Sequence, residues 1–119
     1  MSIKSLAQKF VEMCNQGKNF DVMRSMYAPN IVSVEGDGGE TAGQGPVIKK
    51  SEIWQGQNEI HGERVLGPYF NGPKQFAVHY TFEVTRKGEK NRTTLQEVGV
   101  YTVENDKITR EQFFYDGVH

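Results

Sequence analysis

The chain has 119 residues, of which 14 are basic and 15 acidic, and its formal net charge is −1. A chain of this length is typical of one domain, here residues 1–119, that buries roughly two-thirds of its unfolded surface. The balanced charge gives no electrostatic reason to expect nucleic acid or an anionic membrane as a partner.

Two helices are predicted at the start of the chain. Apolar residues recur at three-and-four spacing from Ile3 to Cys14, and Gly17 can close this first helix. Cys14 lies on the apolar side and is expected to be a small buried residue rather than a nucleophile. Asn19 can cap a second, shorter helix that Pro29 ends. The buried stripe of that helix is expected to contain Phe20, Met23, Met26 and Tyr27.

A short strand and a loop are expected next. The strand is Ile31–Glu35, and its alternation places Glu35 on one face with Ile31 and Ser33. The segment 36–46 is rich in glycine and is expected to be a flexible connection.

The rest of the chain is predicted to form a third helix and an antiparallel meander. The helix spans Val47 to about Asn58, with Ile48, Ile53 and Trp54 on its apolar side. The predicted strands are Glu63–Tyr69, Gln75–Thr85, Arg92–Val103 and Ile108–Asp116. This order of elements indicates an α+β fold in which about three helices cover one face of a bent, mainly antiparallel sheet.

The last two strands form a hairpin that organises the sheet. Asn105 and Asp106 tolerate the positive φ angles of a two-residue turn, so they are expected to connect these strands. Strict alternation in the last strand separates Ile108 and Arg110 from Glu111 and its neighbours on the other face. That second face is expected to carry Thr109, Glu111, Phe113 and Tyr115.

Aromatic residues dominate the expected inner face of the sheet. The apolar set of the second meander strand should meet the helices: Phe76, Val78, Tyr80, Phe82 and Val84. A ligand pocket is predicted with Tyr80, Phe82, Tyr101, Phe113 and Tyr115 as its walls, which suits a small apolar or aromatic ligand. Val98, Val100 and Phe114 fall on the outer face, which predicts a homodimer that buries about 800 Å² per partner.

The chain resembles the SnoaL-like group of the nuclear transport factor 2-like superfamily. The resemblance rests on Met26-Tyr-Ala-Pro-Asn-Ile-Val-Ser-Val-Glu35 and on Val100-Tyr-Thr-Val-Glu-Asn-Asp-Lys-Ile-Thr-Arg-Glu-Gln-Phe-Phe-Tyr115, and it covers nearly the whole chain. It implies a cone-shaped α+β barrel whose curved sheet and helices enclose a hydrophobic pocket, usually within a homodimer. Tyr27 and Trp54 are then expected to join the pocket wall.

The resemblance also implies a type of chemistry. Ketosteroid isomerases and polyketide cyclases of this superfamily use a pocket carboxylate to move a proton next to a carbonyl, and Glu35 stands at the place of the isomerase base. The family's hydrogen-bond donors appear here as Phe10 and Gly99, which cannot donate from a side chain. Losing such a donor removes about 3–4 kcal/mol of transition-state stabilisation, so the steroid isomerase reaction is not expected. The substitute donors are Tyr80, Tyr101, Tyr115 or a protonated Glu97.

Two functions remain open from the sequence. The first is an isomerase, cyclase or lyase with Glu35 as base and Glu97 as a weaker second candidate. The alternative is a non-catalytic module that binds an apolar metabolite or acts as a dimeric interaction protein. Glu35 reads equally well as a strand-end acid facing water, and Glu97 as a partner of Arg110 across the hairpin. His61 and His79 are expected to be structural, since no nucleophile accompanies them.

Location and cofactors follow from what the sequence lacks. No apolar run resembles a signal peptide or approaches the roughly 18 residues of a membrane span, so a cytoplasmic protein without membrane contact is expected. One cysteine and three histidines, one of them terminal, give no ligand spacing for a metal. No metal or other cofactor is expected.

Overall fold

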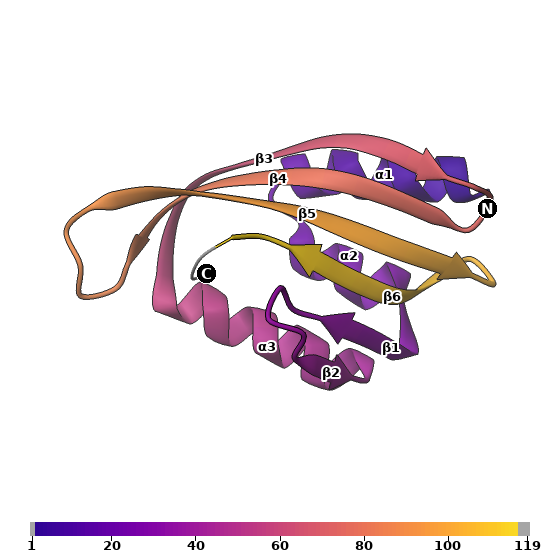
Figure 1. The fold of residues 1–119 in the computed structure, drawn as a ribbon, viewed down its shortest axis with the longest axis horizontal. Coiled ribbons are helices and arrows are strands. Elements are labelled where there is room, and N and C mark those ends of the chain that lie inside the picture. The colour runs from indigo at the N-terminus through magenta and orange to yellow at the C-terminus, as the bar shows by residue number, and fades with distance from the viewer. Residues whose placement is uncertain (1, 117–119) are drawn as a thin grey trace.

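The computed structural model describes residues 2–116, which form three helices and six strands. In chain order these elements are α1 (Ile3–Asn15), α2 (Asn19–Met26), β1 (Tyr27–Val34), β2 (Glu40–Ala42), α3 (Gln44–Gln57), β3 (Asn58–Asn71), β4 (Gln75–Arg86), β5 (Arg92–Glu104) and β6 (Lys107–Phe114). The long strands bend together, and the helices lie on one side of the sheet they form (Figure 1). None of the helices within residues 2–116 has the length and apolar character needed to cross a bilayer.

The strands form a single mixed sheet in the order β2-β1-β6-β5-β4-β3. Strands β1 and β6 pair in parallel, and every other neighbouring pair is antiparallel. The sheet is curved and does not close into a barrel, because β2 and β3 are its two edges. The predicted α+β architecture, with helices on one face of a bent and mainly antiparallel sheet, is confirmed.

The first helical pair follows its predicted boundaries only in part. Gly17 adopts a φ of 76°, so it ends α1 in the left-handed conformation expected of a closing glycine. The cap of α2 was expected at Asn19, but Lys18 holds that position and Asn19 is the first helical residue. The helix ends at Met26, and Tyr27 starts β1 rather than extending the helix. Pro29 pushes Ala28, the residue before it, towards extended backbone, so the helix could not have continued past Tyr27.

Several other boundaries differ from the prediction. Strand β1 begins at Tyr27 because its first residue pairs with Ile108 of β6, a contact that no local pattern encodes. The segment 36–46 is not only a loop, since it contains β2 and the first turn of α3. Strand β3 begins at Asn58, directly after α3 ends. The start of β1 is therefore set by its pairing partner in β6.

The buried side of α3 also differs from the prediction. Val47 is fully buried, whereas Ile53, expected on the apolar side, is 51% exposed. Residues three to four positions apart share a face of a helix, and Ile53 lies six positions after Val47. The packed face instead runs from Val47 to Trp54.

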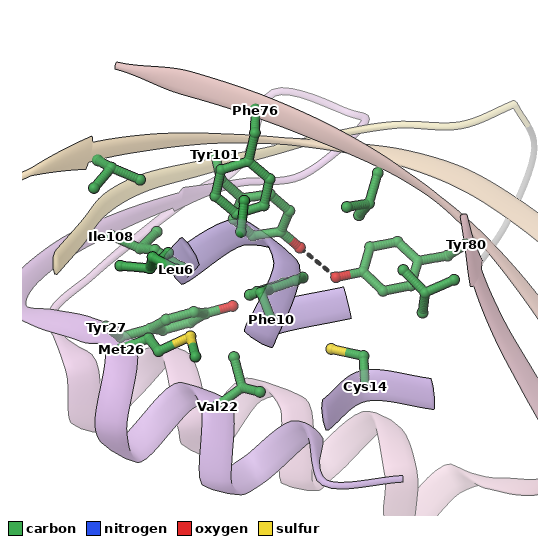
Figure 2. Close-up of a cluster of buried hydrophobic side chains, with 14 of the residues drawn as sticks. Leu6, Phe10, Cys14, Val22, Met26, Tyr27, Phe76, Tyr80, Tyr101 and Ile108 are labelled. Atoms are coloured by element: carbon green, nitrogen blue, oxygen red, sulfur yellow. Dashed lines mark hydrogen bonds between the residues drawn. The ribbon is translucent and has the colours of Figure 1, made fainter. Parts of the chain in front are cut away.

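The hydrophobic core lies between the helices and the sheet. Figure 2 shows Leu6 and Phe10 of α1 beside Phe76 and Tyr101 of the sheet. All five residues predicted to form the inner face of β4 are buried, which confirms the alternation of that strand: Phe76, Val78, Tyr80, Phe82 and Val84. Phe10 lies 5.4 Å from Phe76 and 4.7 Å from Tyr101, measured between ring centroids.

The hairpin of β5 and β6 has the predicted turn but not the predicted alternation. Asn105 and Asp106 have φ angles of 51° and 62°, as the two-residue turn requires. The register then shifts, because Val103 pairs with Ile108 while Thr102 pairs with Arg110. The extra residue is a β-bulge, and it turns both Ile108 and Glu111 inward. The prediction that these two residues occupy opposite faces is wrong.

Candidate functional site

A cavity of about 790 Å³ lies between the helices and the sheet. All three helices contribute to its wall, as do β3, β4, β5 and β6. Every residue proposed from the sequence as a pocket or catalytic residue lines this cavity: Tyr27, Glu35, Trp54, Tyr80, Phe82, Glu97, Tyr101, Phe113 and Tyr115. The volume is within the range of cavities that hold drug-sized molecules.

Glu35 follows the last residue of β1, at the rim of the cavity. A tight turn fixes its backbone, since its N–H donates to Gly39 and its carbonyl accepts from Gly38, both at 2.9 Å. One carboxylate oxygen forms an ion pair with Lys50 of α3. The other accepts a hydrogen bond of 3.2 Å from the Tyr115 hydroxyl. Glu35 is therefore a partly exposed carboxylate held from two sides.

Lys50 is the cation of the site, and the sequence reasoning missed it. Its Nζ donates to Ser33 Oγ at 2.6 Å and lies 5.7 Å from the centre of the Phe113 ring. Its position three residues after Val47 and four before Trp54 puts it on the packed face of α3. That spacing could have identified Lys50 from the sequence, because a lysine on the packed face of a helix needs a polar partner.

Glu97 projects into the cavity from β5. Its register partner on the neighbouring strand is Tyr80. Pairing with Arg110, one of the two readings from the sequence, is excluded because Arg110 is opposite Thr102. The pKa of Glu97 is raised to about 8, first by burial and then by the nearby charges of Glu35 and Glu111, while Lys50 opposes the rise. Glu97 is therefore mostly protonated at neutral pH and can donate a hydrogen bond.

Glu111 is a second carboxyl group that the sequence reasoning did not assign to the site. Its side chain is 2% exposed, and it accepts hydrogen bonds from the hydroxyls of Tyr27 and Ser33. Burial raises its pKa, against the lowering effect of these bonds. Alternation in the last strand places Glu111 on the face of Phe113 and Tyr115, and the bulge at Thr109 adds Ile108 to that buried side.

Two tyrosines form a polar pair on the cavity floor. The hydroxyl oxygens of Tyr80 and Tyr101 are 2.5 Å apart, and Figure 2 shows the two rings pointing these groups at each other. Burial raises the pKa of both hydroxyls well above the usual tyrosine range. It also raises the pKa of the adjacent Cys14 thiol, which Tyr80 contacts by a hydrogen bond. These three groups are consequently neutral and linked to one another.

The two positions that depart from the family pattern are filled by packing. Phe10 is 1% exposed and belongs to the core. Gly99 leaves room for the ring of Tyr101, since a Cβ there would approach the Tyr101 hydroxyl to 2.9 Å. Neither position supplies a side-chain donor to the cavity, and the protonated groups two residues either side of Gly99 on β5 are Glu97 and Tyr101.

Aromatic rings form the middle of the cavity wall. Trp54 meets Phe82 edge to face with 5.5 Å between ring centres. Tyr80 stacks on Phe82 at 5.6 Å. Rings in this arrangement present flat apolar surfaces, which suits a planar ligand.

A further polar contact lies beside β3. Asn19 Nδ2 of α2 donates to Glu63 Oε2 at 2.7 Å, and both residues line the cavity. His61 is exposed and its Nε2 lies 2.7 Å from Thr85 Oγ1. Within residues 2–116, no group of three or more His, Cys, Asp or Glu side chains is arranged to hold a metal ion.

Comparison with known proteins agrees with this architecture. The sequence model of the SnoaL-like domain family matches residues 1–115. A protein from Mesorhizobium loti, described as a candidate SnoaL-like polyketide cyclase and also as a carbohydrate phosphatase, is 42% identical with a TM-score of 0.91. The alignment covers 97% of this chain and 100% of that one. No match was found among curated proteins.

More distant structures share the fold alone. A candidate polyketide cyclase from Xanthomonas campestris pv. campestris is 15% identical, with a TM-score of 0.70 over 95% of this chain and 89% of that one. TerC, co-crystallised with polyporic acid, is 19% identical, with a TM-score of 0.69 over 94% of this chain and 89% of that one.

Proposed function

This chain belongs to the SnoaL-like domain family, and we propose that its cavity binds a flat aromatic carbonyl compound and moves a proton at the carbon next to that carbonyl. The observation that carries the proposal is a pair of carboxyl groups in one cavity, with Glu35 ion-paired to Lys50 and Glu97 protonated at neutral pH. A carboxylate and a protonated carboxyl group in one site are commonly found where an enzyme needs a base and an acid.

Glu35 is the proposed base. Its carboxylate takes the proton from the carbon, and the electron pair of the broken C–H bond moves into an enolate whose charge lies on the former carbonyl oxygen. The protonated Glu35 then returns the proton to the same carbon or to another carbon of the enolate. Lys50 and Tyr115 hold the carboxylate at the cavity rim before the transfer.

Glu97 is the proposed donor to the enolate oxygen. The candidates named from the sequence were Glu97 and three tyrosines, and two of these, Tyr80 and Tyr101, bond to each other. A carboxylic acid kept neutral by burial can donate a strong hydrogen bond to a developing oxyanion. The pKa of about 8 supports Glu97 in this role.

The chemical class of the ligand follows from the cavity wall. Trp54, Phe82 and Phe113 supply flat apolar surface, and the carboxyl groups of Glu35 and Glu97 line the same cavity. The co-crystal of TerC with polyporic acid supports a small organic molecule as the kind of ligand.

A binding module without chemistry is the second candidate. It is favoured by the ion pair, because the Lys50 ammonium already occupies one oxygen of the Glu35 carboxylate. In that case the same cavity holds the aromatic compound and no proton moves.

Deuterium exchange separates the two functions. The probe is 2-acetonaphthone, a planar ketone whose methyl protons exchange with D₂O only through the enolate. We expect the wild-type protein to accelerate this exchange at pH 7, and Glu35→Gln to slow the catalysed rate by at least about 100-fold. Glu97→Leu removes the donor and should slow it by roughly 100-fold as well.

Binding is measured in parallel through the fluorescence of Trp54, the only tryptophan of the chain. Glu35→Gln should keep its affinity for the ketone. The matched control is Glu40→Gln, an exposed acid on the adjacent β2 that should change neither quantity. Exchange by Glu35→Gln at the wild-type rate would exclude Glu35 as the base. Binding of the ketone by the wild type without any catalysed exchange would favour the non-catalytic binding module.

A homodimer through the outer face of the sheet is part of the proposal. Phe114 is 52% exposed and is the register partner of Val98, next to Val100 on the same strand. An interface of about 800 Å² per partner would cover this apolar strip. Light scattering at tens of micromolar should give twice the monomer mass, and Phe114→Lys should shift it towards the monomer. A strict monomer at that concentration would contradict the proposal.

A further inference from the structure

The cavity has a second polar end, formed by Glu63 and Asn19. Glu63 lies on β3, the edge strand at the opposite side of the sheet from β1 and β2, and Glu35 follows β1. Three strands separate these sides in the sheet order, yet both glutamates line one cavity. A ligand that fills the cavity therefore meets a carboxyl group at each side.

The Glu63 carboxyl group is incompletely paired. Asn19 Nδ2 donates to its Oε2 at 2.7 Å, and this is the only hydrogen bond that the side chain makes with residues 2–116. No cation forms an ion pair with Glu63 in this part of the chain. A partly buried carboxyl group with a free oxygen is costly, and a donor on a ligand would relieve that cost.

A purely structural role for Glu63 explains less. Helix α1 is already joined to β3 by the side chain of Asn15. Its Oδ1 accepts a hydrogen bond of 2.8 Å from the Val65 N–H, and its Nδ2 donates one of 2.9 Å to the Val65 carbonyl. A neutral amide at position 63 could bond Asn19 equally well without a desolvated charge. The carboxyl group is thus better matched to a ligand than to the helix.

The chemistry of the surroundings selects the group that Glu63 receives. Its free oxygen accepts hydrogen bonds, and its charge repels anions. Phe82, its register partner on β4, and Trp54 provide a flat apolar wall between this end and Glu97. We propose that Glu63 and Asn19 form a subsite for an aromatic hydroxyl group, so that the substrate is an elongated aromatic ketone with a phenol at the end away from the reacting carbonyl. This proposal rests on the function proposed above.

The test compares four naphthalenes that differ at one position. They are 2-acetonaphthone and its 6-hydroxy, 6-methoxy and 6-amino derivatives, and their dissociation constants are measured by Trp54 fluorescence. The wild-type protein should bind the 6-hydroxy compound about tenfold more tightly than 2-acetonaphthone or the 6-methoxy compound, which lacks the donor. Glu63→Gln should remove most of this preference and leave the affinity for 2-acetonaphthone unchanged. Glu63→Leu serves as a second variant, and Glu59→Gln, an exposed acid on the same strand, is the control.

The outcomes distinguish this subsite from the proposed function. Equal affinity for the hydroxylated and parent ketones, or a preference that survives in both Glu63 variants, would overturn the subsite even if Glu35-dependent exchange is observed. Tighter binding of the amine than of the phenol would overturn the assignment to a hydroxyl group. A hydroxyl preference that depends on Glu63 supports the subsite even if no exchange occurs. Failure of all four ketones to bind would overturn the ligand class and the subsite together.

Discussion

Tyr27 donates its hydroxyl hydrogen bond to Glu111 across the parallel pair of β1 and β6. Both residues are buried, with exposures of 4% and 2%, and both line the cavity. The bond joins the only parallel strand pair within residues 2–116 and holds a carboxyl group beside Ser33 and Lys50.

Removing this donor should destabilise the fold. In Tyr27→Phe, Glu111 keeps Ser33 but loses the bond that opposes its desolvation, so the free energy of unfolding should fall by about 1–3 kcal/mol. Urea denaturation at pH 7 measures the change. Tyr69→Phe, at a residue that is 58% exposed, is the control and should be nearly neutral. A Tyr27→Phe protein as stable as wild type would show that the bond contributes nothing net.

The raised pKa of Glu97 predicts a pH dependence of stability. The folded state binds the Glu97 proton with a pKa of about 8, against 4.5 for an unperturbed glutamate. The stability from this proton is fully present below about pH 4.5 and is lost as the pH rises through 8. Glutamine at position 97 has no proton to release in this range. The free energy of unfolding of Glu97→Gln should therefore rise relative to that of wild type by up to about 1.4 kcal/mol per pH unit between pH 4.5 and 8.

The measurement is the difference between the two unfolding free energies from pH 4.5 to pH 9. Taking the difference isolates Glu97, because Glu63 and Glu111 also have raised pKa values. The control Glu40→Gln should show the same pH dependence of the unfolding free energy as wild type. A pH-independent difference between wild type and Glu97→Gln would mean that Glu97 titrates normally.

Lys50 should control the protonation of both inner carboxyl groups. Its charge lowers the pKa of Glu97 and of Glu111, so Lys50→Met should raise both. Carbon-13 NMR of the glutamate carboxyl groups follows the Glu97 midpoint directly. Lys49→Met changes the neighbouring, exposed lysine and should leave that midpoint near 8. Equal titration midpoints of Glu97 in the two variants would show that the Lys50 charge does not affect the pKa of Glu97.

Gly36 should be needed for the position of Tyr115. A Cβ at Gly36 would lie 2.9 Å from the Tyr115 ring, so Gly36→Ala should displace the ring and weaken its bond to Glu35. Changes in the Tyr115 ring resonances would report the displacement. Gly45→Ala is the matched control, because nothing lies within 4 Å of its added methyl group. Unchanged Tyr115 resonances in Gly36→Ala would contradict this packing.

Local patterns predicted the parts of the fold that depend on local physics. The alternation of β4, the closing glycine of α1 and the turn at Asn105 and Asp106 each depend on neighbours in sequence, and each is confirmed. The sequence pointed to Glu35 by its strand position and the family resemblance, and to Glu97 as a substitute for the donor that Gly99 lacks. The structure brings them to one cavity.

Long-range pairing decided what the sequence did not predict. Tyr27 fits a helical stripe by spacing, but β6 supplies a strand partner that draws it into β1. Glu111 shares a face with Ile108 only because an extra residue enters β6 at the bulge. Lys50 could be placed on the packed face of α3 once that helix was known to begin at Gln44 and to bury Val47. Registers and bulges of this kind are properties of strand pairs, which a single sequence does not display.

The parallel pairing of β1 with β6 also constrains the order in which the site can be assembled. Strand β1 is synthesised before β2 to β5, whereas its parallel neighbour β6 follows all of them. Contacts between segments so far apart in sequence require closure of a long loop and slow folding relative to local contacts. The β3–β4–β5 meander can pair as it is synthesised, but Glu35, Lys50 and Glu111 can meet only after β6 has been added. The charged centre of the cavity therefore depends on β6, because a nascent chain that stops before Lys107 lacks Glu111.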